Sequence, residues 1–229
     1  MTKLTDDRVT KTPPAGVTRN ETEERLLDEA LTLFAAKGFA ATSVREIIEA
    51  AGVTRPVLYY YCDSKQDLFE RVVKWKHEAA YRELEAALTS ARSVRSRLRA
   101  IATGTFAFCA ADPRVPQLMF QSTFGPVVSE LTGFLQSMAD MRFGIVSGVM
   151  QDAVEAGELQ GGDAASLALV FCSIIDYHAN CLARMPDAHK QLTPELGESL
   201  VDAFLFGVAT GRRRTPRLPK TVSRRQSDR

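Results

Sequence analysis

The chain has 229 residues, of which 45% are hydrophobic and 25% are charged, and its formal net charge at pH 7 is +1. These values are typical of a globular protein. The low net charge excludes a protein whose whole surface is basic enough to attract nucleic acid, so any nucleic-acid-binding site must be local. The N-terminus shows no signal peptide, and the longest apolar run, residues 167–175, is too short to cross a bilayer. We therefore expect a cytoplasmic protein with no membrane partner.

The chain begins with a polar stretch, residues 1–18, whose Pro13, Pro14 and Gly16 predict a flexible arm. Apolar residues then recur at helical spacing until Gly38, which is placed to end a first helix. Ser43 begins the next segment, so the connection between the first two helices is short.

Three further helices follow closely. Ser43 and Glu46 have the spacing of a capping box that opens the second helix, and Gly52 ends it. Thr54 suits the start of a very short third helix, and Ser64 caps a fourth that runs to about residue 89. Two short helices joined by a tight glycine-containing turn form a helix-turn-helix, whose second helix can lie in a DNA major groove.

The second half of the chain predicts longer helices, at residues 93–110, 113–124, 127–156, 163–185 and 194–210. Residues 212–229 lose the apolar periodicity and hold eight basic residues against one acidic residue, which predicts a disordered tail. No segment has the pattern of a strand, so the sequence predicts an all-α fold in two parts.

The sequence gives no sign of a metal site or a cofactor site. Cys62, Cys109, Cys172 and Cys181 lack the C-x-x-C spacing and have apolar neighbours, which is typical of reduced, buried thiols in a cytosolic protein. The histidines are scattered along the chain. We therefore expect no metal and no cofactor.

The third helix contains three consecutive tyrosines, residues 59–61, which point in different directions. Leu58 and Cys62 are four residues apart and share the face that packs inward. The outer face is then formed by Arg55, Pro56, Tyr59 and Tyr60, with Tyr61 at the boundary.

The outer face suits base recognition in DNA. Arg55 can form two hydrogen bonds with one guanine, and the ring of Pro56 can contact a thymine methyl group. The phenols of the tyrosines, together with Thr54, Ser43 and Lys65, are suited to phosphates.

Two alternatives stand beside this interpretation. A glycine-containing turn is weak evidence for DNA binding on its own, and tyrosine runs also occur at protein interfaces. The chain could thus be a helical ligand-binding or interaction module whose degenerate helix-turn-helix no longer regulates transcription. An enzyme is not favoured, because the sequence has no nucleophile elbow, H-E-x-x-H, P-loop or dinucleotide fingerprint, and we expect no catalytic residues.

Residues 19–73 resemble the N-terminal domain of the TetR family of bacterial transcriptional regulators (AcrR-like). The matching features, in order, are Ala30, Leu33-Phe34, Gly38-Phe39, Thr42-Ser43-Val44, Ile47, Ala51-Gly52-Val53, Leu58-Tyr59, Tyr61 and Ser64-Lys65 with Leu68. The resemblance covers about a quarter of the chain. It implies a three-helix DNA-binding domain at residues 19–66 and a larger helical ligand-binding and dimerisation domain at residues 67–211.

The resemblance also implies roles for individual residues. By position, those near bases are Arg45, Arg55, Pro56, Val57 and Tyr59, and those near phosphates are Thr42, Ser43, Tyr60, Tyr61 and Lys65. The sequence departs from the family pattern where Cys62 replaces the usual Phe and Ile48 replaces the usual Ala. We expect the larger Ile48 to fill the volume that Cys62 leaves.

The Phe and Met residues of the second half could line a pocket for an apolar ligand. The candidates are Phe106, Met119, Phe120, Phe124, Phe134, Met138, Met141 and Phe171, with Asp176 and His178 as polar groups. For any one of them, a place in the core is the simpler explanation. Asp176 follows an apolar run, so it lies at a surface, is paired, or binds a ligand.

Residues 163–185 are apolar on two sides, so this helix can face both the subunit core and a second subunit. One stripe consists of Leu167, Phe171, Ile174 and His178, and the other of Ala168, Cys172, Ile175 and Ala179. We assign the second stripe to a dimer interface, together with Leu200 and Phe204, because the last two helices form the dimer in the resembling family. The alternative is a helix fully buried within a monomer.

These expectations combine into one functional hypothesis. We expect a homodimeric transcriptional repressor that places residues 54–61 in the major groove of a palindromic operator. A hydrophobic small molecule bound among residues 100–185 would move the fourth helix and release the DNA. Charged residues are sparse between residues 101 and 129, which favours such an effector over a nucleotide or a sugar.

Overall fold

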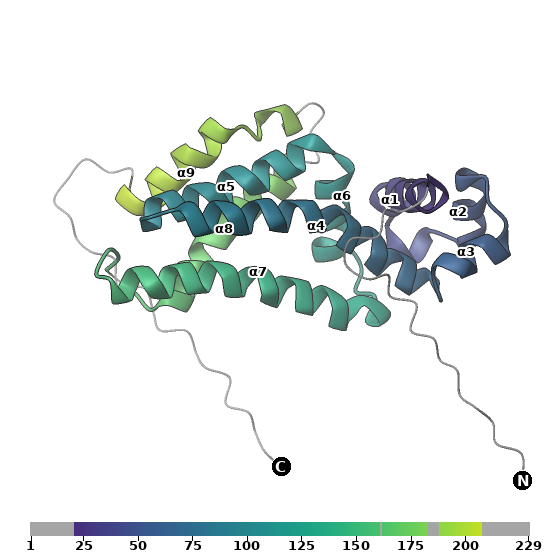
Figure 1. Cartoon of the computed structure of the whole chain (residues 1–229), viewed down its shortest axis with the longest axis horizontal. Helices are drawn as coiled ribbons and strands as arrows, with labels where there is room; N and C mark the ends of the chain where they lie inside the picture. Colours follow the sequence, from purple (N-terminus) through teal and green to yellow (C-terminus); the bar gives the residue numbers. More distant parts are fainter. Residues whose placement is uncertain (1–20, 161, 183–187, 208–229) are drawn as a thin grey trace, which may run out of the picture.

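The computed structural model describes residues 21–160, 162–182 and 188–207, and over these ranges the chain is helical with no strand (Figure 1). The helices are α1 (Glu21–Ala41), α2 (Val44–Ala51), α3 (Arg55–Tyr61), α4 (Lys65–Ser90), α5 (Val94–Ala111), α6 (Arg114–Phe124), α7 (Ser129–Glu155), α8 (Ala164–Leu182) and α9 (Pro194–Phe206), with a short 3-10 turn at Ala188–Gln191. The all-α prediction is confirmed. The predicted arm at 1–18, the tail at 212–229 and the last residues of the helix predicted at 163–185 lie outside the described residues.

The predicted helix ends agree closely with the structure. The Ser43–Glu46 capping box is present, and Gly52 ends α2 in the left-handed conformation with φ 61°. Gly38 breaks α1 at φ 79° and ψ 169°, where we expected the first helix to stop, and a short helical turn follows up to Ala41. Thr54 begins α3 as predicted, although its hydroxyl makes no capping hydrogen bond.

The small domain packs around a hydrophobic core built from α1, α2, α3 and the first turns of α4, and Leu118 of α6 and Leu131 of α7 are buried in the same core. Phe34, Phe39 and Phe69 pack ring against ring, with centroids 5.2–5.9 Å apart. Leu58 is fully buried and Cys62 is 2% exposed, so the inner face of α3 rests on this core. The core therefore fixes which face of α3 points to solvent.

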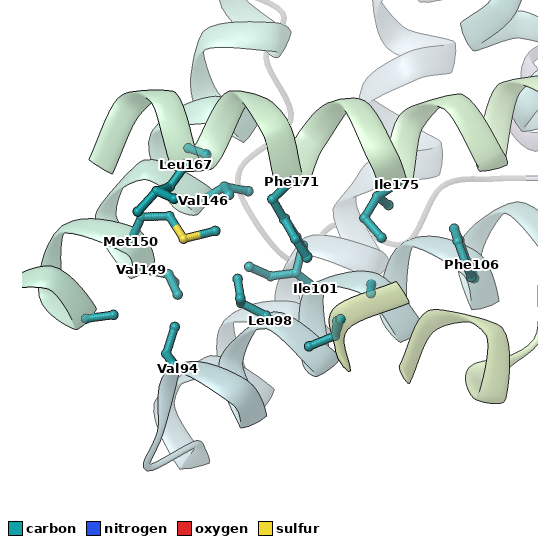
Figure 2. Packing of buried hydrophobic residues seen from close by; sticks show 14 of the residues in the cluster. Val94, Leu98, Ile101, Phe106, Val146, Val149, Met150, Leu167, Phe171 and Ile175 are labelled. Atoms are coloured by element: carbon teal, nitrogen blue, oxygen red, sulfur yellow. The ribbon is translucent and has the colours of Figure 1, made fainter. Parts of the chain in front are cut away.

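The large domain is a helical bundle in which α5 packs along α9 and α7 packs along α8. In Figure 2, Phe171 and Ile175 point from α8 toward Leu98 and Ile101 of α5. All four side chains are at most 4% exposed. Gly197 lets α9 approach α5 closely, since a Cβ atom there would lie 3.3 Å from the backbone nitrogen of Thr103.

Besides this shared core, two connections hold the domains together. The first is α4, which begins in the small domain and continues along the large one (Figure 1). The second is an ionic cluster that we call the Arg114 bridge. At the start of α6, Arg114 donates to both carboxylate oxygens of Asp28 on α1, at 2.7 and 3.0 Å, and to both of Asp112, at 2.8 and 2.9 Å. Lys76 of α4 contacts Asp112 at 2.8 Å, so the bridge joins α1, α4 and α6.

Helix α8 is more apolar than its longest uninterrupted run suggested. Within the described residues, its stretch Ala164–Cys181, with mean hydropathy 1.3, is long and apolar enough to cross a membrane by composition. The uninterrupted run at 167–175 is shorter than this stretch and lies within it. In this fold, however, 44% of that stretch is buried, and Phe171 and Ile175 contribute to the core, as is typical of the central helix of a bundle.

The cysteines are all free thiols, and they fall into two groups. Cys62 and Cys109 are buried, as predicted, and burial raises the pKa of each thiol to about 12. Cys172 and Cys181 are only half-buried. Burial also raises the pKa of Cys172.

Candidate DNA-binding surface and ligand cavity

The outer face of α3 is open to solvent. Arg55 and Pro56 are exposed, and Tyr59 and Tyr60 are 41% and 64% exposed. The guanidinium of Arg55 lies 6.0 Å from the centre of the Tyr59 ring, which holds both side chains on one side of the helix. Tyr61 is half-buried, at the boundary where we expected it. The large aromatic area exposed here is unusual for a monomer surface and is suited to a partner.

Helix α2 contributes the neighbouring part of this surface. Arg45 has an exposed side chain that pairs with Glu49 at 2.7 Å, one helical turn away on α2. Ser43 is exposed at the start of the helix, and Val57 of α3 is half-buried between the two helices' exposed faces. A hydrogen bond from Lys37, together with those from Ser43, lowers the pKa of Glu46 to about 2, so the capping box stays ionised.

Two residues predicted to contact phosphates have other partners in this fold. Thr42 is 1% exposed, and its hydroxyl donates to the Gly38 carbonyl at 2.8 Å, so we remove its side chain from the DNA-binding set. The ammonium of Lys65 donates to the carbonyls of Phe39 and Thr42, both at 3.0 Å, and lies over the Phe39 ring. Lys65 therefore ties the start of α4 to the end of α1, a structural role that we had not predicted.

The large domain contains a cavity of about 590 Å³ between α4, α5 and α7, with Met119 of α6 at its edge. This volume lies in the range of small-molecule sites. Its wall is largely apolar and includes Ala80, Leu84, Ala107, Phe108 and Val146. Polar groups come from His77, Tyr81, Thr103, Thr105 and Arg142.

Most of the predicted ligand residues lie elsewhere. Among the ten, all of which are in the described part of the chain, Met119 alone lines the cavity. Phe106 and Phe171 are core residues at most 1% exposed. Phe134 and Met138 pack against the small domain, and Phe120 stacks on the exposed Phe124.

The remaining three predicted residues are polar or exposed. Met141 is 54% exposed, and His178 bonds through Nδ1 to the Ile174 carbonyl of its own helix. Asp176 is paired, as one of our three alternatives held, and its partner is Arg142 in the cavity wall. Arg142 is thus the link between a predicted residue and the observed cavity.

The cavity residues that were not predicted come mainly from α4 and α5. Tyr81 and Leu84 lie one turn apart or less on the inner side of α4, facing Phe108 of α5 across the cavity. Arg142 could have been found, because it is a basic residue within a long apolar segment. Across the described residues, no three His, Cys, Asp or Glu side chains gather closely enough to hold a metal ion.

The predicted dimer stripe faces inward. Ala168, Ile175 and Ala179 are at most 1% exposed within the single chain, so they belong to the subunit core rather than to a free surface. Phe204 packs on Phe171 with ring centroids 5.4 Å apart. The other two residues assigned to the interface, Cys172 and Leu200, are partly buried and also pack against this core.

A different side of the bundle is open. Leu169 and Tyr177 of α8 are 52% and 69% exposed, and Ser173 lies exposed between them at helical spacing. On α9, Phe206 is 63% exposed. An apolar helix with Leu and Tyr open to water is typical of an interaction surface.

Two short helices, α2 and α3, joined by a tight turn, with the outer face of α3 exposed, form the arrangement of a helix-turn-helix DNA-binding protein. The sequence profile of the family described as bacterial regulatory proteins, tetR family, matches residues 26–72. The transcriptional repressor KstR2 of Rhodococcus jostii is 27% identical over 161 residues, which are 69% of this chain and 79% of KstR2. The transcriptional activator FasR of Mycolicibacterium smegmatis is 28% identical over 132 residues, which are 56% of this chain and 60% of FasR.

Similarity of fold extends over the large domain as well. The crystal structure of the regulator FadR from Bacillus subtilis in complex with stearoyl-CoA matches with a TM-score of 0.70 at 18% identity, covering 81% of this chain and 99% of FadR. Residues 26–72 of the chain therefore resemble the DNA-binding domain of bacterial regulators of the tetR family, and the chain is a DNA-binding transcriptional regulator.

Proposed function

We propose that the chain is a homodimeric repressor that leaves its palindromic operator when a hydrophobic small molecule enters the cavity between α4, α5 and α7. The observation that carries the proposal is the course of α4. Lys65 and Leu68 in its first turn belong to the DNA-binding domain, whereas Tyr81 and Leu84 line the cavity. One rigid element therefore contacts both sites, and a ligand that displaces it at one end moves it at the other.

The DNA-binding set that we propose follows the exposed surface. Arg55, Pro56 and Tyr59 would contact bases, with Arg45 and Val57 beside them. Ser43, Tyr60, Tyr61 and Thr54 would contact phosphates, and the Thr54 hydroxyl suits this because no capping hydrogen bond engages it. Lys65 would orient the domain, and one of its three N–H donors stays available for a phosphate.

The dimer would form through the exposed side of α8 and through α9, not through the stripe that we first assigned. Leu169 and Tyr177 offer apolar surface that a two-fold partner can cover, which gives the self-complementary contact of a symmetric dimer. Two linked half-sites then raise the affinity for a palindrome well above that of one domain.

The sign of regulation and the ligand class have separate support. KstR2 is named a repressor, whereas FasR is named an activator. We propose repression because the match to KstR2 covers more of this chain than the match to FasR. FadR was crystallised with stearoyl-CoA, and an apolar chain of that kind suits the apolar wall of this cavity.

The test is a footprint of the protein on the intergenic DNA beside its own gene, followed by titration with candidate effectors. We expect a protected palindrome whose protection is lost with Arg55→Ala and reversed by a cavity ligand. A protein that binds small molecules but protects no DNA would instead be a module with a degenerate helix-turn-helix. Protection that increases when the ligand is added would contradict release.

A further inference from the structure

One end of the cavity carries an unusual charge. The charged residues in its wall are Lys76, Glu83 and Arg142. Lys76 is held by Asp112 at 2.8 Å, and Glu83 is exposed at the solvent side of α4. Arg142 lies on α7 with its side chain 27% exposed, and most of the cavity wall around it is apolar. A guanidinium is costly to bury unless anions or other acceptors satisfy it.

Asp176 and the half-buried Cys172 satisfy Arg142 only in part. The contact joins one Nη2 atom of Arg142 to one Oδ1 atom of Asp176, whereas a guanidinium has five N–H donors and can bind a carboxylate through two parallel bonds. Among the described residues, the cavity wall includes Arg142 but not its partner Asp176. The cavity wall therefore holds a cation whose own anion is not part of that wall.

The groups around Arg142 favour an anion on its cavity side. The phenol of Tyr81 lines the same cavity as Arg142 and can donate a further hydrogen bond. His77 is also in the wall, and burial lowers its pKa, with the nearby Arg142 acting in the same direction. His77 is therefore neutral at pH 7 and adds no competing charge. Leu84, Phe108 and Met119 make other parts of the wall apolar.

We infer that the cavity binds an apolar molecule that ends in a carboxylate, with the carboxylate on Arg142 and Tyr81 and the apolar chain against Phe108 and Met119. The inference rests on the proposed ligand function and specifies the class of its ligand. The bound carboxylate would compete with Asp176 for Arg142. Since Asp176 belongs to α8 and Arg142 to α7, ligand binding would loosen the ionic contact between these helices.

The experiment compares three ligands that share a ten-carbon chain: decanoate, decanol and decyltrimethylammonium. Calorimetric titration of the full-length protein at pH 7.5 is expected to show decanoate binding about 10- to 100-fold more tightly than decanol, which is the usual gain from hydrogen bonds to a charged partner. The ammonium compound should bind more weakly than decanol, because it meets Arg142.

Two variants then test whether Arg142 binds the carboxylate of the ligand. Arg142→Met should reduce the preference for decanoate over decanol to about onefold while decanol affinity stays the same. Asp176→Asn should increase decanoate affinity several-fold, because it removes the internal competitor. The matched controls are Arg97→Met and Asp152→Asn, which break an Arg–Asp contact of 2.7 Å between α5 and α7 outside the cavity wall. These controls should leave the preference unchanged.

The outcomes separate this inference from the function on which it rests. If decanol or the ammonium compound binds the wild-type protein as tightly as decanoate, the carboxylate site is refuted and the apolar cavity stands. If none of the three binds, the ligand cavity itself is refuted. If Arg142→Met fails to fold, as judged by circular dichroism, the comparison of ligands on the wild-type protein and the Asp176→Asn variant still test the carboxylate site. An unchanged decanoate affinity in Asp176→Asn would contradict the proposed competition between the ligand and Asp176.

Discussion

Replacing Arg114 by methionine should loosen the DNA-binding domain from the ligand domain. Methionine keeps much of the apolar stem but removes the guanidinium, which donates to Asp28 and Asp112 through two bonds each and to the Thr32 hydroxyl at 2.8 Å. Among the described residues, Lys76 would then be the only cation of the Arg114 bridge that still contacts Asp112. The contact between α1 and α6 would then depend on apolar packing.

The magnitude follows from the exposure of each partner. The Asp28 side chain is 44% exposed, and a pair of this kind contributes roughly 0–1 kcal/mol. The Asp112 side chain is 16% exposed, and hydrogen bonds to such a charged group contribute about 1.5–3 kcal/mol. We therefore expect Arg114→Met to lower the free energy of unfolding by about 2 kcal/mol, since part of the Asp112 contact is retained by Lys76.

The pH dependence gives a second measure of the same bridge. Burial alone would raise the pKa of Asp112, but hydrogen bonds from Arg114 and Lys76 hold it well below its usual range. A carboxylate with a lowered folded-state pKa stabilises the protein above its unfolded pKa of about 4 and loses this contribution as the pH falls below that value. The stability difference between wild type and Arg114→Met should thus be full at pH 7 and shrink below about pH 4.

The assay is urea unfolding at pH 7 and at lower pH, combined with operator titration. We expect operator affinity to fall in the variant, because two recognition helices that are less firmly oriented match the half-site spacing less often. Arg97→Met serves as the control, since it breaks an exposed pair within the large domain. An Arg114→Met protein with wild-type stability and wild-type operator affinity would refute the role of the bridge.

Three further predictions concern the DNA, the dimer and the ligand. Arg55→Ala should weaken operator binding by roughly 1–3 kcal/mol and relax the preference at one base pair per half-site, measured against base-substituted operators, whereas Arg97→Ala should do neither. Leu169→Arg should give a folded monomer by sedimentation, because the charge would lie in the proposed interface, and a dimer that survives the change would place the interface elsewhere. Phe108→Ala should raise the effector concentration needed for operator release about tenfold without changing ligand-free DNA affinity, while Phe124→Ala, at an exposed position, should leave both unchanged.

The local structure of the small domain could be predicted from the sequence because it depends on neighbouring residues. The capping box of Ser43 and Glu46 and the left-handed Gly52 are set by short-range hydrogen bonds and backbone sterics. The outward face of α3 followed from helical periodicity alone. Thr42 was misjudged because its burial depends on the packing around the end of α1, where its hydroxyl donates to the carbonyl of Gly38, four residues earlier.

The cavity and the dimer surface could not be predicted in the same way. Phe and Met occur both in hydrophobic cores and in pocket walls. Their spacing in the sequence therefore could not distinguish Phe106, which is buried in the core, from Phe108, which lines the cavity. On α8, every side of the helix is largely apolar, and which side is buried depends on the placement of α5, α7 and α9. Leu169 is exposed for that reason, whereas Ala168 is buried beside it.

The unequal burial of the thiols offers a way to follow the protein spectroscopically. Thiolates, not thiols, react with maleimides, so Cys62 and Cys109, with pKa values raised to about 12 and buried sulfur atoms, should label very slowly. Cys172 is half-buried on the same helix as Asp176, and its pKa is lowered in part by Arg142, though burial raises it overall. In a Cys181→Ser background, the rate at which a fluorescent maleimide reaches Cys172 would report how often α7 and α8 separate.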